Sequence, residues 1–264
     1  MLNNITMGQY YPVDSPIHRL DPRTKLISTI LFIVAVFMAK GVAGYCLLLA
    51  FIWLVADLAK IPFSMLIKGI RPLRMILVLT FLLNLFFTAG ETVLFEVWKI
   101  RLTAEALRQA VFYSLRLVFL VIGTSLLTLT TSPVALSDAI EILLGPLKKI
   151  HFPTHELAMM MTIALRFIPT LLDETDKIMK AQMARGADFE SGNLISRAKS
   201  MVPLLVPLFV SAFRRAGDLA MAMESRCYRG GEGRTRFRVL KMTRADALAL
   251  LVMAALLILE VFLP

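Results

Sequence analysis

Residues 26–58 read LISTILFIVAVFMAKGVAGYCLLLAFIWLVADL, two apolar runs that are separated only by Lys40 and Gly41. A helix that crosses a bilayer needs about 20 predominantly apolar residues. The first run, residues 26–39, is shorter than that, so we expect its helix to begin near Arg23 or to tilt little. The second run, residues 42–58, predicts another spanning helix.

The composition of the whole chain agrees with these runs. Of its 264 residues, 58% are hydrophobic and 18% are charged, and the mean hydropathy is +0.72. Soluble domains are about 45–50% apolar and about 25% charged. Further apolar runs cover residues 73–89, 106–131 and 245–263. The sequence therefore predicts an all-α membrane protein with about five transmembrane helices.

The distribution of charge predicts the orientation. Residues 59–72 and Arg74 carry four basic residues and no acid, whereas residues 90–105 mix acids with bases. By the positive-inside rule the first of these loops is cytoplasmic and the second lies outside. This places the N-terminus and residues 132–243 in the cytoplasm. The same bias accounts for the net charge of +10, so no nucleic-acid partner is expected. Residues 1–21 are polar, and no signal peptide is expected.

The segment between the fourth and fifth spans is helical but only half apolar. A shorter helix is expected over residues 132–147, followed by two long amphipathic helices. Their apolar stripes run from Leu157 to Ile178 and from Leu194 to Ala222, and residues 186–193 separate them with Gly and Asn stop signals. Pro169, Pro203 and Pro207 lie inside the pattern, where prolines kink helices. We divide the chain into residues 1–131, 132–243 and 244–264.

Catalytic motifs do not occur in the sequence. It has no HExxH, GxSxG or P-loop pattern, so no intrinsic enzyme activity is expected. His151 and His155 have the spacing of two helical metal ligands, but Pro153 disturbs the helix that such a site needs, and no metal site is predicted. Cys46 and Cys227 are interpreted as packing residues. Arg116, inside the fourth span, is expected to snorkel toward the outer interface.

Two short clusters stand at the C-terminal ends of the long stripes, Met183-Ala184-Arg185-Gly186 and Glu224-Ser225-Arg226-Cys227-Tyr228-Arg229-Gly230-Gly231. In each, an arginine lies between small residues. Such an arginine stands clear of its neighbours, so its planar guanidinium can enter a groove on a partner and bind carboxylates or helix-end carbonyls. The alternative is an ordinary helix C-cap. A C-cap explains Gly186 well but explains the pair of similar clusters poorly.

An N-terminal segment completes the pattern. It reads SPIHRLDPRTK over residues 15–25 and contains His18, Asp21, Pro22, Arg23 and Lys25. With the two arginine clusters, it makes nearly the whole chain resemble the transmembrane T component of energy-coupling factor (ECF) transporters, EcfT. The second cluster departs from the family's Ala-Arg-Gly pattern by reading Ser-Arg-Cys, so its flanking residues are less diagnostic than its arginine.

The resemblance implies a non-catalytic subunit of an ATP-driven transport complex in the cell membrane. In this family the cytoplasmic coupling helices dock on two ABC-type ATPases and hold a small membrane-embedded S component that captures a vitamin or other micronutrient. The resemblance implies ATPase docking by Arg185 and Arg226, with Ala184, Gly186 and Ser225 beside them. ATP and Mg are used by the partner ATPases, and no cofactor is expected on this chain.

Two alternatives remain open at this point. An ABC importer permease would line its own substrate path, although the spans offer little polar lining. A membrane scaffold without a transport role would share the amphipathic helices but gives no reason for two arginine clusters. The basic segment 229–244 is expected to meet anionic lipid headgroups. Neither the substrate nor the number of S components served follows from the sequence.

Overall fold

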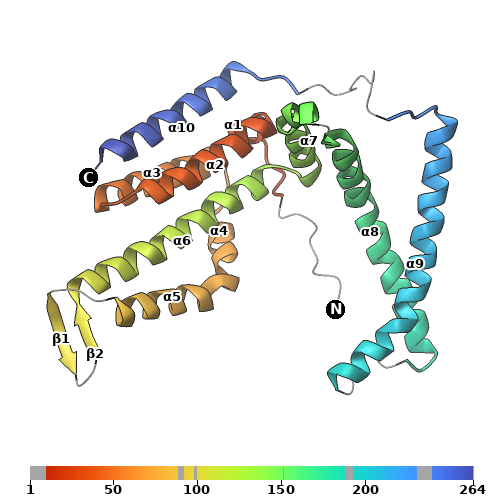
Figure 1. The fold of residues 1–264 in the computed structure, drawn as a ribbon, viewed down its shortest axis with the longest axis horizontal. Coiled ribbons are helices and arrows are strands. Elements are labelled where there is room, and N and C mark those ends of the chain that lie inside the picture. Colours follow the sequence, from red (N-terminus) through yellow and green to blue (C-terminus); the bar gives the residue numbers. More distant parts are fainter. Residues whose placement is uncertain are drawn as a thin grey trace. The chain divides into compact units, whose positions relative to one another are not determined.

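The computed structural model describes residues 10–88, 92–97, 100–150, 152–187, 189, 193–230 and 240–263. These residues form two compact units, each described separately below: a membrane unit of residues 10–139 and 240–263, and a paired-helix unit of residues 140–230. Apart from one short hairpin the elements are helical, which confirms the predicted all-α membrane class (Figure 1). The helices are α1 (Pro16–Arg19), α2 (Pro22–Met38), α3 (Val42–Leu58), α4 (Phe63–Ile70), α5 (Arg74–Phe87), α6 (Ala104–Thr130), α7 (Pro133–Leu143), α8 (Thr154–Ala184), α9 (Leu194–Ser225) and α10 (Arg244–Phe262), with short 3-10 helices η2 (Arg71–Leu73) and η3 (Gly145–Ile150).

Several helices match the predicted spans closely. The bounds of α3 are those predicted, and α2 begins at Pro22, close to the expected Arg23. With 17 residues, α2 is about 25 Å long, which is short for a hydrocarbon core of about 30 Å. By length and composition, the helical stretches of the described residues that can cross a membrane are Phe63–Phe87, Ala104–Thr130, Thr154–Ala184 and Arg244–Phe262; α3 is a shorter apolar helix.

The core of the membrane unit lies where α2, α6 and α10 run side by side (Figure 1). α10 packs along α2, and both α2 and α3 pack on α6. Small residues such as the fully buried Ala35 let the helix backbones approach closely. Gly123 on α6 has the same effect, because a Cβ there would lie 2.5 Å from the Phe32 ring. The buried cluster comprises Phe32, Ala35, Val36, Ala39, Tyr45, Leu48, Ile52, Phe119, Met253 and Leu256.

The third predicted span differs from a simple helix over residues 73–89. Helical structure begins at Phe63 in α4 and passes through η2, which contains Pro72, before α5 starts in a new direction (Figure 1). A proline lacks the N–H that would continue the helical ladder, so it favours a turn at this point. Both α4 and α5 pack on α6.

A hairpin that the sequence did not predict precedes α6. Strands β1 (Val93–Val97) and β2 (Ile100–Thr103) pair antiparallel, with Val97 opposite Ile100. Both strands contain β-branched residues, which favour extended structure. The all-α class therefore holds for the spans but not for this connection.

The paired-helix unit contains the two long helices. α8 has 31 residues and α9 has 32, and they lie on either side of the predicted break, since α8 ends at Ala184 and α9 begins at Leu194. Both helices continue through their prolines, Pro169 in α8 and Pro203 and Pro207 in α9. Figure 1 shows that α9 bends along its length without a break.

A polar contact at Glu174 joins α8 to α9. The Glu174 carboxylate accepts a hydrogen bond from Ser211 Oγ at 2.6 Å and another from the Arg215 guanidinium at 2.9 Å. The ion pair is partly exposed, with side-chain accessibilities of 37% for Arg215 and 24% for Glu174. Within the described part of this unit, Ala158 and Leu204 are the buried hydrophobic residues. The apolar stripes of the two helices are therefore largely uncovered.

Candidate functional site

The first arginine motif, Ala184-Arg185-Gly186, closes the C-terminal end of α8. Arg185 is the C-cap residue, with φ −90° and ψ 8°, and Gly186 follows in the left-handed conformation with φ 88°. The N–H of Gly186 donates to the Met183 carbonyl at 2.9 Å, and the N–H of Ala187 donates to the Gln182 carbonyl at 3.0 Å. These two bonds form a Schellman motif, which satisfies carbonyls that a helix end leaves open.

The second motif, Ser225-Arg226-Cys227, closes α9 with the same geometry. Arg226 is the C-cap residue, with φ −94° and ψ 15°, and Cys227 takes the left-handed position with φ 56°. The N–H of Cys227 donates to the Glu224 carbonyl at 2.8 Å, and the N–H of Tyr228 donates to the Met223 carbonyl at 3.0 Å. A left-handed conformation costs a residue with a Cβ roughly 1–2 kcal/mol. The departure from glycine at this position therefore keeps both Schellman hydrogen bonds, with φ 56° in place of the 88° of Gly186, but adds strain.

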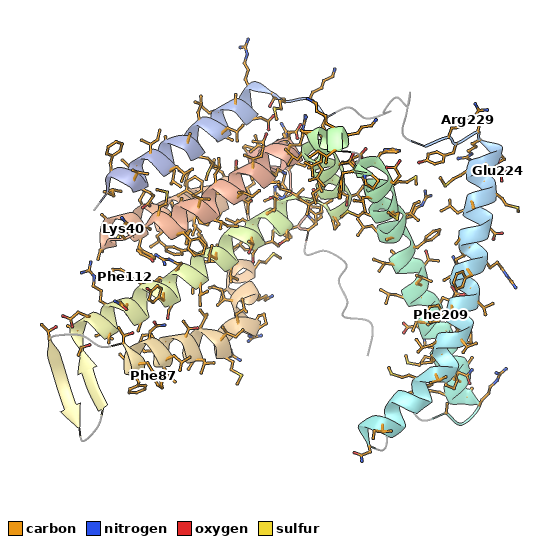
Figure 2. The ribbon with its side chains drawn as sticks, in the orientation of Figure 1. Lys40, Phe87, Phe112, Phe209, Glu224 and Arg229 are labelled. Atoms are coloured by element: carbon orange, nitrogen blue, oxygen red, sulfur yellow. The ribbon has the colours of Figure 1, made fainter. Side chains whose placement is uncertain are left out.

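Both motifs present their arginines in the same way. The Arg185 and Arg226 side chains are exposed, and among the residues with described positions neither has a hydrogen-bond or ion-pair partner. Figure 2 shows Glu224 and Arg229 at the same end of α9. The C-cap interpretation explains the left-handed conformations of Gly186 and Cys227. It does not explain a role for the two guanidinium groups. ATPase docking by these arginines remains a prediction.

The N-terminal motif forms a compact polar cluster in the membrane unit. Ser15 caps α1 by accepting a hydrogen bond from the His18 N–H, and its hydroxyl also lies 2.7 Å from His18 Nδ1. Asp21 caps α2 by accepting from the Arg23 N–H at 2.9 Å, with Pro22 at the first helical position. The Arg23 guanidinium donates two hydrogen bonds to the Asp21 carboxylate, at 3.1 and 2.9 Å.

The same motif reaches the far end of the chain. The Asp21 N–H donates to Asp246 Oδ1 on α10 at 2.8 Å, and the Arg23 guanidinium donates to the Leu240 carbonyl at 3.1 Å. The Lys25 ammonium donates to the carbonyls of His18 and Thr130, at 3.0 and 2.9 Å. The family motif is therefore a junction that ties the start of α2 to the end of α6 and the start of α10.

Sequence reasoning missed Asp246. Its other carboxylate oxygen accepts from the N–H and the hydroxyl of Thr243, both at 2.7 Å, in a capping box at the start of α10. The Thr-x-x-Asp spacing before an apolar run could have indicated this cap. The contact with Asp21 could not have been read from local sequence.

Electrostatics favour the ionised form of Asp21. The hydrogen bonds from the Arg23 guanidinium lower the pKa of the Asp21 carboxyl, against the opposing effect of burial. A carboxyl whose pKa is lower in the folded state stabilises the fold at neutral pH, and this contribution is lost as the pH falls through the lowered pKa. On His18 burial has the opposite effect on the pKa: it disfavours the charged imidazolium and so lowers the pKa of the ring.

A second polar cluster in the membrane unit involves Arg116. Arg116 was expected to snorkel toward the outer interface; its guanidinium donates to the carbonyl of Ala39, the C-cap of α2, at 3.2 Å and lies over the rings of Phe37 and Tyr113. Glu260 on α10 is 2% exposed, and its carboxylate has no hydrogen-bond partner among the described residues. It lies against Gly44, where a Cβ would come within 2.5 Å of Oε2. The sequence did not single out Glu260.

Possible metal ligands are sparse in the described ranges. No group of three or more His, Cys, Asp or Glu side chains that could hold a metal ion occurs there. His155 lies 3.1 Å from a Glu141 carboxylate oxygen, while His151 lies outside the described residues.

Cys46 and Cys227 are both free and exposed, so neither is the packing residue that the sequence predicted.

Comparisons with known proteins identify the family. The family model described as "Cobalt transport protein" matches residues 14–237. The chain is 60% identical to the energy-coupling factor transporter transmembrane protein EcfT of Thermosediminibacter oceani, over 94% of this chain and 93% of that protein. It is 57% identical to the EcfT of Acidaminococcus fermentans over 100% and 98%, and 52% identical to that of Bacillus subtilis over 97% and 98%. The chain therefore belongs to the family of energy-coupling factor transporter transmembrane proteins, as the resemblance predicted.

Proposed function

We propose that this chain couples ATP hydrolysis by two ABC-type ATPases to movement of an S component that takes up a vitamin or other micronutrient. The observation that carries the proposal is the pair of matching helix ends at Arg185 and Arg226. Two equivalent ATPase subunits need two equivalent contacts. The two C-caps have backbone angles that differ by only a few degrees and end in exposed arginines.

The chemistry of an exposed C-cap arginine supports docking. Its guanidinium carries a fixed positive charge and five N–H donors in one plane, which suits carboxylates or open helix carbonyls in a partner's groove. The Schellman turns fix the backbone conformation at each arginine, so less conformational entropy is lost when the arginine binds a partner. We assign Arg185 and Arg226 as the docking residues, with Ala184, Gly186 and Ser225 as small neighbours.

The uncovered stripes of α8 and α9 supply a second surface, which we assign to the S component. Phe209 on α9, labelled in Figure 2, is 62% exposed. Phe213 and Met221 on the same helix are 73 and 68% exposed, and Met160 and Met161 are exposed on α8. Soluble surfaces rarely leave this much contiguous apolar area uncovered. Methionine side chains adapt to different partners, which suits a component that serves more than one protein.

The orientation follows from the charges. We place the N-terminus and the paired-helix unit in the cytoplasm, because the stretch from Lys60 to Arg74, which contains α4 and η2, carries four basic residues and no acid. α8 is long and apolar enough to span a membrane by composition. We assign it to the cytoplasmic side because Lys177, Lys180 and three acids share its C-terminal half. ATP and Mg act in the partner ATPases.

The test is co-purification of the ATPases with tagged full-length chain in mild detergent. Arg185→Ala and Arg226→Ala should each weaken retention by roughly 30-fold or more, because leaving a buried partner unpaired costs about 2–5 kcal/mol. Arg214→Ala is the matched control, since Arg214 is exposed on α9 but lies away from the helix end. Equal retention of the ATPases by wild type and the double arginine variant would refute the assignment.

The same preparation separates the alternatives. Two ABC ATPases and a small hydrophobic protein in the complex support the proposal. A permease that lines its own path would transport substrate without a small third protein. A scaffold would retain partners but show no dependence of uptake on Arg185.

A further inference from the structure

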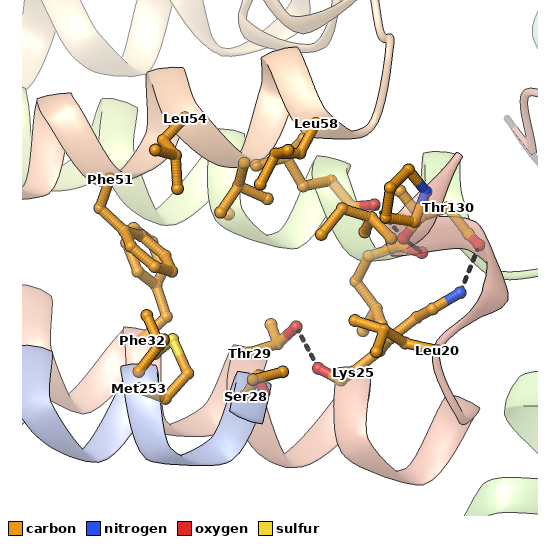
Figure 3. Close-up of a pocket in the computed structure, with 18 of the residues that line it drawn as sticks. Leu20, Lys25, Ser28, Thr29, Phe32, Phe51, Leu54, Leu58, Thr130 and Met253 are labelled. Atoms are coloured by element: carbon orange, nitrogen blue, oxygen red, sulfur yellow. Dashed lines mark hydrogen bonds between the residues drawn. The ribbon is translucent and has the colours of Figure 1, made fainter. Parts of the chain in front are cut away.

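The membrane unit contains a cavity that the proposed function does not use. Its volume is about 300 Å³, and its walls come from α1, α2, α3, α6 and α10 (Figure 3). The side chains on these walls are mainly aliphatic or aromatic. None of them belongs to the arginine motifs, so an inference about the cavity is independent of ATPase docking.

The cavity has a buried floor and an exposed rim. Phe32, Ile52 and Met253 on the floor are each less than 5% exposed, at 4, 3 and 3%. The rim is formed by Leu54 and Leu58 on α3 and by Leu248 and Val252 on α10, with exposures between 42 and 64%. The opening therefore lies between α3 and α10. It faces the medium that surrounds the spans, which in a bilayer is hydrocarbon.

A few polar groups line the cavity beside Lys25 (Figure 3). Lys25 is 7% exposed, and two carbonyls accept from its ammonium, so among the described residues one of its three N–H groups has no partner. Ser28 Oγ is buried and has no hydrogen-bond partner in the described part of the chain. Thr29 Oγ1 donates to the Lys25 carbonyl at 2.8 Å. A ligand with an apolar body and an oxygen acceptor at one end would pack against the apolar lining and accept hydrogen bonds from Lys25 and Ser28.

We propose that this cavity binds one acyl chain of a membrane phospholipid, which enters between α3 and α10 and places an ester oxygen near Lys25 and Ser28. Water is a poor occupant, because a buried water needs two to four polar partners and most of the wall is apolar. The opening between α3 and α10 meets the lipid hydrocarbon, so an acyl chain can enter the cavity directly from the bilayer.

Photolabelling of the unmodified chain tests the proposal directly. The full-length protein is placed in phosphatidylglycerol vesicles that contain a phospholipid with a diazirine on its acyl chain, illuminated and digested. We expect adducts on the floor residues Phe32 and Met253 and on Ser28, besides exposed residues such as Trp53. Adducts confined to Trp53, Leu251 and other exposed positions would overturn the proposal.

A pair of variants gives a second, independent measurement. Ala249 lines the cavity, whereas Ala247 on the same helix is exposed and does not. Ala249→Phe should reduce the phospholipid that remains bound in native mass spectrometry at least tenfold, and Ala247→Phe should leave it unchanged. Equal retention by both folded variants would overturn the proposal. If Ala249→Phe does not fold, the photolabelling result decides.

The assembled complex provides the last outcome. A photoreactive amino acid at Leu248 should capture phospholipid in the complex as well as in the isolated chain. Capture of a protein helix instead of lipid would show that the opening is a protein interface and would overturn the proposal.

Discussion

The membrane unit and the paired-helix unit differ in how much of their apolar surface they cover. In the first, Phe32, Leu48 and Phe119 are buried between helices, and the outward apolar residues face hydrocarbon. In the second, Ala158 and Leu204 are the buried hydrophobics of the described residues, while Phe213 is 73% exposed. The first unit therefore has a packed hydrophobic core of its own. The second leaves most of its apolar side chains uncovered, and under the proposed function partner chains cover them.

The largest effect expected from this difference concerns two phenylalanines. Phe32→Ala should lower the free energy of unfolding by roughly 3–5 kcal/mol, because it leaves a cavity in a packed core. Phe213→Ala should change it by less than about 0.5 kcal/mol in the isolated chain. Thermal unfolding in detergent measures both. Similar losses for the two variants would show that the units do not differ in this way.

The Asp246 junction should give the next largest effect. Asp246→Ala removes the acceptor for Thr243 and for the Asp21 N–H, and we expect a loss of about 2 kcal/mol because these hydrogen bonds involve a charged group. Asp218→Ala is the control, since Asp218 is exposed on α9. The measurement is the midpoint of unfolding in a denaturant series. An unchanged midpoint for Asp246→Ala would show that the junction does not stabilise the membrane unit.

The two helix ends should respond in opposite directions. Gly186→Ala forces a Cβ into a left-handed position and should destabilise the end of α8 by about 1 kcal/mol, whereas Cys227→Gly should relieve strain at the end of α9 by a similar amount. Hydrogen exchange of the amides in each last turn reports the changes separately. Faster exchange after Cys227→Gly would contradict the matching geometry of the two caps.

The smallest expected effect is that of the ion pair between α8 and α9. A double-mutant cycle with Glu174→Ala and Arg215→Ala should give a coupling energy of about 0.5 kcal/mol, because the pair is partly exposed and screened by solvent. A coupling above about 2 kcal/mol would show that this contact is part of a packed core, and the contrast between the units would weaken.

Much of the fold was predictable because each span is a local pattern. The apolar run of α3 has the predicted bounds, and Gly186 and Asn193 marked the gap between α8 and α9. The arginine motifs could also be recognised in the sequence, since each lies within four consecutive residues. The C-cap geometry that they share could not be predicted. Nothing in the sequence indicates that Cys227 adopts the conformation that Gly186 adopts easily.

Contacts between distant segments could not be predicted. Asp21 and Asp246 are 225 residues apart, and their contact depends on α10 packing along α2. The burial of Glu260 against Gly44 has the same origin. The turn at η2 and the β1–β2 hairpin depend on packing as well as on local propensity. A sequence pattern identifies elements, whereas their packing decides which polar groups meet.

The ion pair between α8 and α9 can also be viewed as a pivot. Arg185 follows Glu174 by eleven residues, and Arg226 follows Arg215 by eleven, so the two lever arms have the same length of about 16 Å. Neither arm contains a proline, because Pro169, Pro203 and Pro207 all precede the pivot on their own helix. Any change in the angle between α8 and α9 at this contact would therefore displace the two arginines by similar distances.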